Sequence, residues 1–393
     1  MTMQNEDSTP RRGAEHSEKV TVALVCKHAL EGIGGLENHL EMLLRNVQDP
    51  SCSYVFVTGS EGEDRRSGRV RGYLRFVQRL MRCRSELVHF QGFDRLQILT
   101  LILFARGRIP LVVTPHNGVA GIVNDRKAVR RLAKRWADGL LFPALIRQRA
   151  RIVALCAEER DYYVSRFPGC GHLVEVLPNP IGKHEWTPLL TAPGPTRLLA
   201  LARLDWWKHI EDLISAMALL PSAVECDIAG PDWGAAAALQ DQARQVARTI
   251  RFHGAVRGAE KERLFEDATI VVVPSKAEGL STVALESLAR GIPVIASDWA
   301  SRGLPAEGVY RYRFGSPAGL AGAVEHLLAG ENLVAARRAA RRASTGLVGY
   351  DDYALAIRSL YRLSLEQHRS RITPRGTGHR WRLRSSPGAR RPA

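Results

Sequence analysis

Short apolar runs alternate with longer amphipathic stretches along most of this chain of 393 residues. Buried strands of parallel sheets have such near-continuous apolar runs, because helices cover both faces of the sheet. In the first half the runs are "VTVALVC", "SYVFVTG", "LVHFQG", "LVVTPHNG", "RIVALC" and "LVEVLPNPIG". The pattern therefore predicts parallel strands joined by helices in this half.

The second half repeats the alternation after "TAPGPT" (191–196), whose turn-forming residues indicate a linker. Its apolar runs are "RLLALARL", "ECDIAGP", "IRFHGAV", "TIVVVPS" and "IPVIASD". Segment 350–367, "YDDYALAIRSLYRLSLEQ", is predicted to form a final helix. Because the chain is too long for one hydrophobic core, we expect two similar α/β domains.

Composition narrows the class of protein. The apolar fraction of 45% and the charged fraction of 24% are ordinary for a soluble globular protein. The polar N-terminus lacks the apolar core of a signal peptide. The longest nearly uninterrupted apolar stretch, 96–105, is about half a membrane span, so we expect a buried helix there and no bilayer-crossing segment. The six cysteines are scattered without a CxxC pair, which indicates no zinc site or disulfide framework and fits a reducing cytoplasm.

The net charge of +16 is concentrated partly at the end of the chain. No acidic residue follows Glu366, and eight arginines do. This stretch is rich in Pro, Gly and Ser, so residues 368–393 are predicted to be disordered, as are residues 1–18. Anionic lipid and nucleic acid both fit such a tail, and so does a solvated tail without a specific partner.

Two glutamates mark a strand–loop–helix unit at 275–298, "SKAEGLSTVALESLARGIPVIASD". Glu278 lies in the loop after an apolar run and Glu286 in the first turns of the next helix, at the sheet edge where ligands bind in open α/β sheets. Ser281 can cap this helix, which leaves the amide of Thr282 directed at an anion such as phosphate. The two carboxylates could accept hydrogen bonds from sugar hydroxyls on either side of that phosphate. The alternative is two surface glutamates on an ordinary unit.

Two cations flank a similar junction in "LALARLDWWKH". Arg203 follows a strand, and Lys208 stands at the start of the next helix. Two fixed cations can neutralise a leaving diphosphate without a metal. A surface arginine and lysine are common singly, but their place at a strand–helix junction favours the binding role.

Two further features follow strands of the first half. In "GIGGLE", Gly34 and Gly35 permit close approach of the backbone to a ligand, although Glu37 replaces the third glycine of a dinucleotide fingerprint. In "VVTPHNG", His116 would face the same cleft, although a lone histidine is more often structural.

In their order and spacing, these motifs resemble the GT-B glycosyltransferases of the large retaining class, glycosyltransferase family 4 (group 1). The resemblance covers roughly residues 20–365 and also includes "LPNP". It implies two Rossmann-like domains that face each other across a cleft, with the acceptor-side domain at 19–190 and the nucleotide-sugar-binding domain at 196–345. The helix at 350–367 would cross back onto the first domain.

The resemblance also implies roles for single residues. His116, which would line the reaction centre, and Glu278, which would hold hydroxyls of the transferred sugar, are the candidate catalytic residues. Glu286 would hold the ribose hydroxyls, and Arg203 and Lys208 the diphosphate. The complete set of candidate donor-binding residues is Gly34, Gly35, Arg203, Lys208, Ser281, Thr282 and Glu286. Family members are expected to be hexosyltransferases that retain the anomeric configuration and use neither a metal nor a cofactor.

The chain departs from the family pattern at several glycines. Ala202, His209 and Ser281 stand where the family has glycine, Pro180 follows "LPN", and "WASRG" replaces a glycine pair after "IASD". These departures concern the geometry and identity of the donor more than the activity.

Two basic amphipathic segments bear on the acceptor. Segment 69–84 places Tyr73, Phe76, Val77 and Leu80 on one stripe with arginines elsewhere, and segment 126–140 repeats this with Val129, Leu132, Ala133 and Trp136. Such helices fit an anionic membrane surface. For each one by itself, the ordinary alternative of a helix packed on its sheet with a solvated charged face is favoured.

Together with the tail, the two segments point to a lipid-linked or anionic glycan acceptor. The hypothesis is a cytoplasmic enzyme, peripheral on the inner membrane face, that builds surface polysaccharide or lipopolysaccharide. Alternatives are a nucleic-acid-binding protein, for which the sequence shows no RNP, KH or helix-turn-helix signature, a GT-B protein with epimerase or phosphorylase chemistry, and a donor-binding protein without catalysis.

Overall fold

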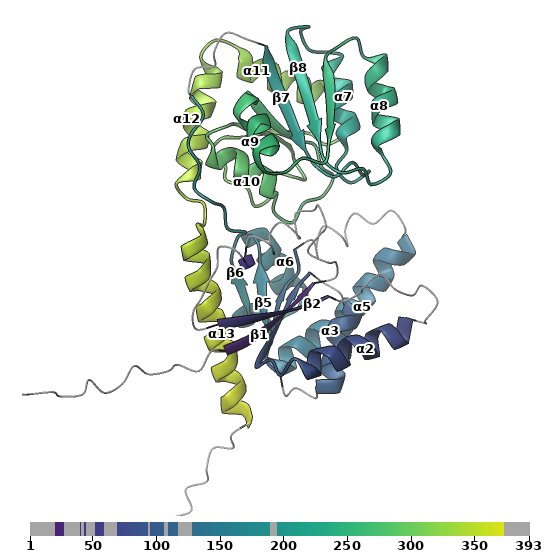
Figure 1. Cartoon of the computed structure of the whole chain (residues 1–393), viewed down its shortest axis with the longest axis vertical. Helices are drawn as coiled ribbons and strands as arrows, with labels where there is room; N and C mark the ends of the chain where they lie inside the picture. The colour runs from purple at the N-terminus through teal and green to yellow at the C-terminus, as the bar shows by residue number, and fades with distance from the viewer. Residues whose placement is uncertain are drawn as a thin grey trace, which may run out of the picture.

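The computed structural model describes residues 20–26, 40, 43–44, 52–58, 69–92, 95–105, 109–116, 128–188 and 195–372. These residues form two α/β domains, one above the other in Figure 1, each built on a six-stranded parallel sheet. The predicted two-domain α/β fold is therefore confirmed. Residues 1–18, most of the linker at 191–196 and the tail from 373 onward lie outside the described residues.

The first sheet has the strand order β2-β1-β3-β4-β5-β6, and all its pairings are parallel. Its strands are β1 (Val20–Cys26), β2 (Cys52–Thr58), β3 (Leu87–Gln91), β4 (Leu111–Thr114), β5 (Arg151–Ala154) and β6 (Val174–Val176). They coincide with the six apolar runs of the first half. Helices that follow β2, β3 and β4 are α2 (Arg69–Arg82), α3 (Arg95–Ala105) and α5 (Ala128–Gln148), and α6 (Ala157–Arg166) follows β5.

The two faces of the first sheet have separate cores. On one face α2, α3 and α5 bury side chains such as Phe76, Leu101 and Phe142. On the other lies the last helix, α13 (Tyr350–Ile372), which follows the second domain in sequence and packs along the first, as Figure 1 shows. The predicted return of this helix is confirmed. It runs to Ile372 rather than residue 367, so residues 368–372 are helical and not part of a tail.

The second sheet has the order β12-β11-β10-β7-β8-β9 and is also parallel. Its strands are β7 (Thr196–Leu201), β8 (Val224–Ala229), β9 (Ile250–Gly254), β10 (Ile270–Val273), β11 (Val294–Ser297) and β12 (Val309–Tyr312). Counted within the sheet, this is the dinucleotide-binding order, and the direction of strand addition reverses between β7 and β10. The sequence did not predict β12, because the half-buried Tyr310 and the exposed Arg311 interrupt the apolar run in "VYRY".

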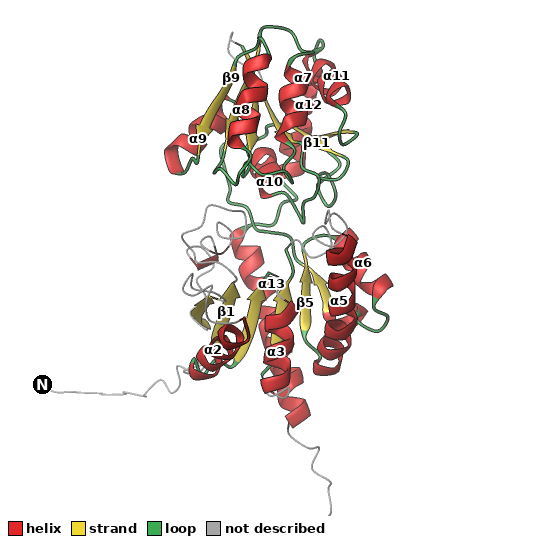
Figure 2. Cartoon of the chain, turned by 90° about the vertical axis from the view of Figure 1, so that its right-hand side faces the viewer, coloured by secondary structure: helices red, strands yellow, loops and turns green. Residues whose placement is uncertain are grey.

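Helices cover both faces of the second sheet, as Figure 2 shows. They are α7 (Ile210–Met217), α8 (Ala236–Gln245), α9 (Gly258–Asp267), α10 (Thr282–Ala289), α11 (Pro317–Leu328) and α12 (Asn332–Ser344). Side chains of β7 alternate between two cores, with Leu198 and Ala200 in one and Leu199 in the other. This alternation is what a strand buried on both faces requires.

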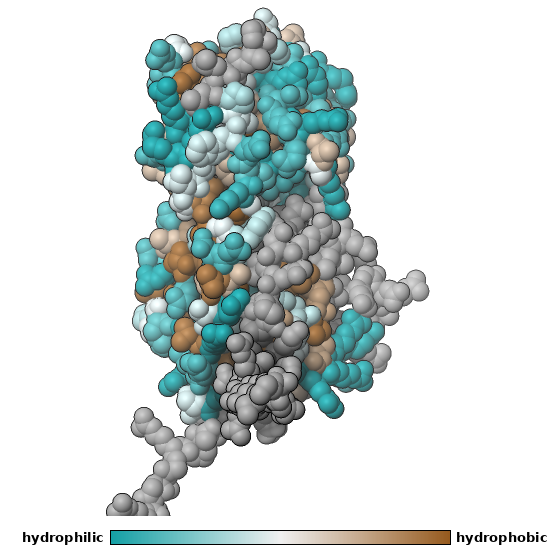
Figure 3. All heavy atoms as spheres, turned by 60° about the vertical axis from the view of Figure 1, so that its left-hand side comes forward, coloured by the Kyte–Doolittle hydropathy of each residue, from teal (hydrophilic) through white to brown (hydrophobic). Residues whose placement is uncertain are grey.

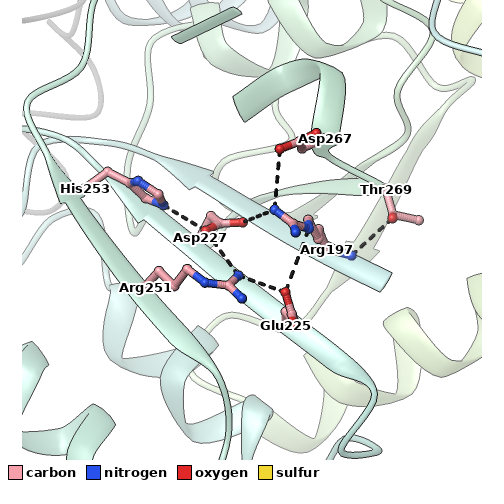
Figure 4. A network of polar contacts seen from close by, with 7 residues as sticks. All are labelled: Arg197, Glu225, Asp227, Arg251, His253, Asp267 and Thr269. Carbon is pink, nitrogen blue, oxygen red and sulfur yellow. Dashed lines mark hydrogen bonds and ion pairs between the residues drawn. The ribbon is translucent and has the colours of Figure 1, made fainter. Parts of the chain in front are cut away.

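A ladder of ion pairs crosses β7, β8 and β9 near the amino-terminal side of this sheet (Figure 4). Arg251 contacts Glu225 at 2.8 Å, and His253 contacts the nearly inaccessible Asp227 at 2.7 Å. Hydrogen bonding from Arg251 lowers the pKa of Glu225 below its ordinary value. The ladder pairs the charges of edge strand β9, and charged edges disfavour pairing with another chain.

The two domains touch beside the chain segments that join them. A Cβ atom built on Gly303 of the second domain would lie 2.6 Å from Cβ of Cys156, which precedes α6 of the first domain. Leu155 and Ile181 of the first domain pack into a core of the second. Figure 3, on the side of α13, shows hydrophilic side chains over most of the second domain and hydrophobic ones gathered near the junction and on the first domain.

Candidate functional site

The two loops singled out in the second half lie side by side at the strand-order reversal. One follows β7 and carries Arg203 and Lys208, and the other follows β10 and carries Glu278. The backbone N–H of Lys276 donates to the carbonyl of Trp207 at 2.8 Å, which ties the loops together. The structure therefore brings these predicted residues to the carboxyl edge of the sheet, where ligands bind in open α/β folds.

Asp205 shapes the first loop. Its carboxylate accepts hydrogen bonds from the backbone N–H groups of Trp207 (2.9 Å) and Lys208 (3.2 Å), which is an Asx-type turn. Its other oxygen lies 3.5 Å from a guanidinium nitrogen of Arg203, whose Cζ is 4.4 Å from the centre of the exposed Trp233 ring. The turn and the ring hold the arginine, so both candidate cations stand on an ordered loop.

Lys208 and Glu278 contact each other directly. Lys208 Nζ donates to Glu278 Oε1 at 2.6 Å, and the two side chains are only 18% and 12% exposed. A charged hydrogen bond in such a shielded place is stronger than one on the surface. In this state the lysine neutralises the carboxylate predicted to grip the sugar.

Glu286 is paired in the same way. Lys261 on α9 places its Nζ 2.8 and 2.7 Å from the two carboxylate oxygens of Glu286 on α10. The sequence did not reveal this lysine, because 25 residues separate the partners. The surroundings also include His184, whose pKa is lowered first by burial and then by Arg290.

The helix start between the two glutamates is capped as predicted. Ser281 is the N-cap of α10, and its hydroxyl oxygen accepts from the backbone N–H of Ala284 at 3.3 Å. Thr282 is the first residue of the helix. Thus the family's glycine is replaced here by a residue that stabilises the helix terminus.

His209 occupies another of the family's glycine positions. It has the left-handed backbone conformation, with φ 51°, which favours glycine. Its ring nitrogen Nδ1 lies 3.2 Å from Asp212 Oδ1, and its ring packs 4.4 Å from that of Phe314. Hydrogen bonding to Asp212 raises the pKa of His209. These side-chain contacts offset the strained backbone directly after Lys208.

His116 lies in the first domain, two residues after β4, and is buried. Its backbone is left-handed, with φ 57°, and its Nε2 donates to Gln91 Oε1 at 2.8 Å. Gly34 and Gly35 lie outside the described residues. Within those residues, no group of three or more His, Cys, Asp and Glu side chains is arranged to hold a metal ion.

Two family models match the chain and together cover most of it. The model described as "Glycosyltransferase Family 4" matches residues 33–183, and that described as "Glycosyl transferases group 1" matches residues 195–330. The chain belongs to the family 4 (group 1) glycosyltransferases. A sequence search among curated proteins returned no match for this glycosyltransferase.

Solved structures show the same fold for this glycosyltransferase. Sucrose-phosphate synthase from Thermosynechococcus elongatus is similar with a TM-score of 0.71 and 19% identity, covering 89% of this chain and all of the other. HepE from Anabaena, in complex with UDP-glucose, has a TM-score of 0.69 and 15% identity over 87% and 99% of the chains. WaaG, described as a glycosyltransferase involved in lipopolysaccharide biosynthesis, has a TM-score of 0.60 and 15% identity. The match covers 86% of this chain and 98% of WaaG. The GT-B fold class is thus confirmed.

Proposed function

We propose that this glycosyltransferase moves a hexose from a nucleoside-diphosphate sugar to a glycan or lipid-linked acceptor, with retention of anomeric configuration. The observation that carries the proposal is the contact between Lys208 and Glu278 at the strand-order reversal. It joins by one hydrogen bond the cation that we assign to the phosphate and the acid that we assign to the sugar hydroxyls. The complex of HepE with UDP-glucose supports a donor of this class.

In the proposed complex the two lysine–glutamate pairs exchange partners for parts of the donor. The diphosphate takes Lys208, together with Arg203, and the sugar hydroxyls take Glu278. The ribose hydroxyls take Glu286 from Lys261. Each exchange replaces one charge-assisted hydrogen bond by others. The lysines therefore neutralise the glutamates before the donor binds, and they do not prevent its binding.

The chemistry assigned to the site needs no metal or other cofactor. The two cations on the β7 loop would stabilise negative charge as it develops on the leaving diphosphate. Glu278, hydrogen-bonded to hydroxyls of the bound sugar, would be a weak nucleophile. We therefore assign front-side attack, in which the acceptor hydroxyl gives its proton to the leaving phosphate and His116 lines the reaction centre.

Donor binding tests the proposal. UDP, GDP and UDP-glucose are added to the pure protein, and the thermal midpoint is followed together with slow hydrolysis of UDP-glucose. A nucleotide at 100 times its dissociation constant should stabilise the protein by about 2.7 kcal/mol. Glu286→Gln should abolish this shift, because an amide cannot accept paired hydrogen bonds from the ribose.

Glu325→Gln, on the exposed surface of α11, is the matched control and should keep the shift. No stabilisation by any nucleoside diphosphate or nucleotide-sugar would overturn the proposed donor class. Transfer to acceptor, with the anomeric configuration of the product read by NMR, distinguishes a retaining transferase from an epimerase, a phosphorylase or an inactive binder.

The acceptor side suggests where the enzyme works. The three adjacent helices α2, α3 and α5, seen together in Figures 1 and 2, carry eleven basic residues and one acid, the buried Asp138. Phe76, Val77 and Leu80 on α2 are buried, as an ordinary packed helix requires. α5 differs, because part of its predicted apolar stripe faces solvent.

The exposed side chains of α5 are spaced four residues apart. Leu132, Trp136 and Leu140 are 57%, 71% and 64% exposed, and Leu103 on the neighbouring α3 is 73% exposed. Helix α5 packs on the sheet through Leu141, Phe142 and Leu145, but Leu132 and Trp136 of the predicted stripe do not take part in that packing. Apolar side chains surrounded by arginines match a membrane surface with anionic headgroups. We accordingly place the enzyme on the inner membrane face, in synthesis of surface polysaccharide or lipopolysaccharide.

Vesicle binding tests this location separately from catalysis. Full-length protein should sediment with phosphatidylglycerol vesicles at physiological salt and much less with phosphatidylcholine vesicles. Trp136→Ser with Leu140→Ser should weaken binding at least tenfold, since each inserted side chain contributes about 1.5–3 kcal/mol. The control pair is Leu355→Ser with Leu363→Ser, at exposed positions of α13. Binding to DNA but not to vesicles would overturn the membrane proposal and support a nucleic-acid partner.

No helix in the described part of the chain is both long enough and apolar enough to traverse a bilayer.

A further inference from the structure

Strand β3 contains two polar residues where a buried parallel strand normally has none. His89 and Gln91 lie two positions apart and so on one face of the first sheet, and both are buried. Burial of a polar group costs free energy unless it is hydrogen-bonded. Such a departure from a local rule is expected where the fold serves a function.

The two side chains belong to a chain of polar contacts that ends at His116. His116 Nε2 donates to Gln91 Oε1 at 2.8 Å. The Gln91 amide nitrogen lies 3.3 and 3.2 Å from the two ring nitrogens of His89. A nitrogen in the plane of the ring and equally far from both ring nitrogens would clash with Cε1 of His89. The near-equal distances therefore place the Gln91 amide nitrogen over the face of the His89 ring. This contact orients the amide oxygen toward His116.

His89 is itself fixed from two other elements. Its Nδ1 lies 2.8 Å from the hydroxyl of Tyr361 on α13, and its Nε2 lies 2.8 Å from Oγ1 of Thr114 at the end of β4. Burial raises the pKa of Tyr361 well above its ordinary value, so its hydroxyl keeps its proton. All members of the chain are at most 9% exposed. Water therefore does not compete for these hydrogen bonds.

We propose that Gln91 is a positioning residue for His116, and that Tyr361 couples this role to the crossing helix α13. Gln91 Oε1 can only accept, so it selects the tautomer of His116 that carries its proton on Nε2 and leaves Nδ1 as an acceptor. The left-handed backbone of His116 supports this assignment. The left-handed conformation costs a non-glycine residue about 1–2 kcal/mol. It persists where contacts with the surrounding residues hold the backbone in place.

The coupling to α13 follows from its place in the chain. This helix comes after the last helix of the second domain and covers the first sheet. A shift of α13 would move the Tyr361 hydroxyl and, through His89, the Gln91 amide. The orientation of a side chain in one domain is thus tied to the segment that joins both. This inference rests on the proposed function only in placing His116 at the reaction centre.

The tautomer of His116 is the direct test. Long-range ¹H–¹⁵N NMR spectra of the full chain with labelled histidine, assigned with His116→Gln, should show His116 with its proton on Nε2. Gln91→Met should give a mixture of tautomers, whereas Gln91→Glu should keep the Nε2-protonated form because its carboxylate still accepts. Gln97→Met, which removes another buried amide of the same domain, should leave the His116 signals unchanged.

Tyr361→Phe separates the two parts of the proposal. It should shift the tautomer populations in the same direction as Gln91→Met, but less. Unchanged His116 signals in Tyr361→Phe would overturn the coupling to α13. Unchanged signals in Gln91→Met, or equal changes in Gln97→Met, would overturn the positioning role itself.

Kinetics supply a second readout. For UDP-glucose hydrolysis, Gln91→Met should lower kcat by about tenfold and leave KM within about twofold, because Gln91 orients a catalytic group and does not hold the nucleotide. A change in KM alone would contradict the role. If the wild-type protein does not turn over UDP-glucose, the same comparison is made with the nucleotide-sugar that stabilises it, and the NMR result by itself decides whether Gln91 positions His116.

Discussion

Lys208 Nζ donates to Glu278 Oε1 at 2.6 Å and thereby joins two loops that are 70 residues apart in sequence. Both side chains are shielded from solvent, so each charge depends on the other while the site is without a donor. Lys261 and Glu286 repeat the arrangement on neighbouring helices. Each candidate carboxylate of this glycosyltransferase thus forms an ion pair with a lysine while no donor is bound.

Removal of Lys208 should separate its structural and functional roles. Lys208→Met leaves Glu278 as a shielded, uncompensated carboxylate and should destabilise the protein by about 2 kcal/mol, whereas the double variant with Glu278→Gln should recover most of that loss. Turnover of the donor should fall by about 100-fold or more in both variants, as when one transition-state donor is lost. Thermal unfolding and UDP-glucose hydrolysis measure the two effects. Recovered activity in the double variant would exclude a direct role for the lysine.

Gly230 lies directly against the backbone of the loop that carries Arg203 and Lys208. It follows β8 with φ 150°, and a Cβ atom there would lie 1.8 Å from the carbonyl oxygen of Ala202, directly before Arg203. Gly230→Ala should cost about 3 kcal/mol and reduce UDP binding, because the backbone carrying Arg203 must shift.

A helix glycine in open space provides the control for that substitution. Gly322→Ala in α11 meets nothing within 4 Å and should stabilise the protein by about 0.5–1 kcal/mol. Differential scanning calorimetry and titration with UDP measure both variants. Normal UDP affinity in folded Gly230→Ala would show that Arg203 does not depend on this close approach.

The sheets were predictable because a parallel strand covered on both faces must be apolar throughout, as "LVVT" and "IVVV" are. Strand β12 escaped prediction because Arg311 and the half-buried Tyr310 interrupt its pattern. The loops that carry Arg203 and Glu278 were predictable for a related reason. They directly follow recognisable strands, and parallel strands present their carboxyl ends at one edge.

The remaining parts of the site depend on three-dimensional contacts that sequence spacing does not show. Periodicity placed Leu132 and Trp136 on one side of a helix, but it could not tell whether the sheet covers that side. Lys261 and Glu286 meet only because α9 and α10 pack together. The link from Tyr361 to His89 joins residues 272 positions apart. Such pairings follow from the fold as a whole.

His209 gives a pH-dependent prediction at the donor loop. Hydrogen bonding to Asp212 raises its pKa in the folded protein above the ordinary value of 6.5. Its stabilising contribution is therefore fully present below pH 6.5 and is lost as the pH rises through the folded-state pKa. His209→Gly removes this contribution but also removes left-handed strain worth about 1 kcal/mol.

The comparison of thermal midpoints tests this balance. His209→Gly should be less stable than the wild type at pH 5.5 and equal or more stable at pH 9. His326→Ala, which removes an exposed histidine of α11, should show no such crossover. A constant difference between His209→Gly and the wild type across this range would mean that the contact with Asp212 does not hold the loop.

Glu159 on α6 couples pH to the junction between the domains. Its carboxylate accepts from the backbone N–H of Leu155 at 2.8 Å and from the hydroxyl of Tyr163 at 3.3 Å, yet burial raises its pKa from 4.5 to about 7. Leu155 packs into a core of the second domain. A raised folded-state pKa means that the folded protein holds the proton more tightly than the unfolded chain, so stability falls as the pH rises from 4.5 to about 7.

Replacement of Glu159 by glutamine should remove this dependence. Glutamine stays neutral at every pH and can still accept from Leu155, so Glu159→Gln should match the wild type near pH 4.5 and exceed it above pH 7 by up to about 3 kcal/mol. Glu158→Gln, at the exposed neighbouring position, should show the same dependence of stability on pH as the wild type. Thermal midpoints at pH 5 and pH 8 measure the effect. Equal pH profiles for Glu159→Gln and the wild type would show that the carboxylate is solvated in the folded protein, because only loss of hydration makes its ionisation costly there.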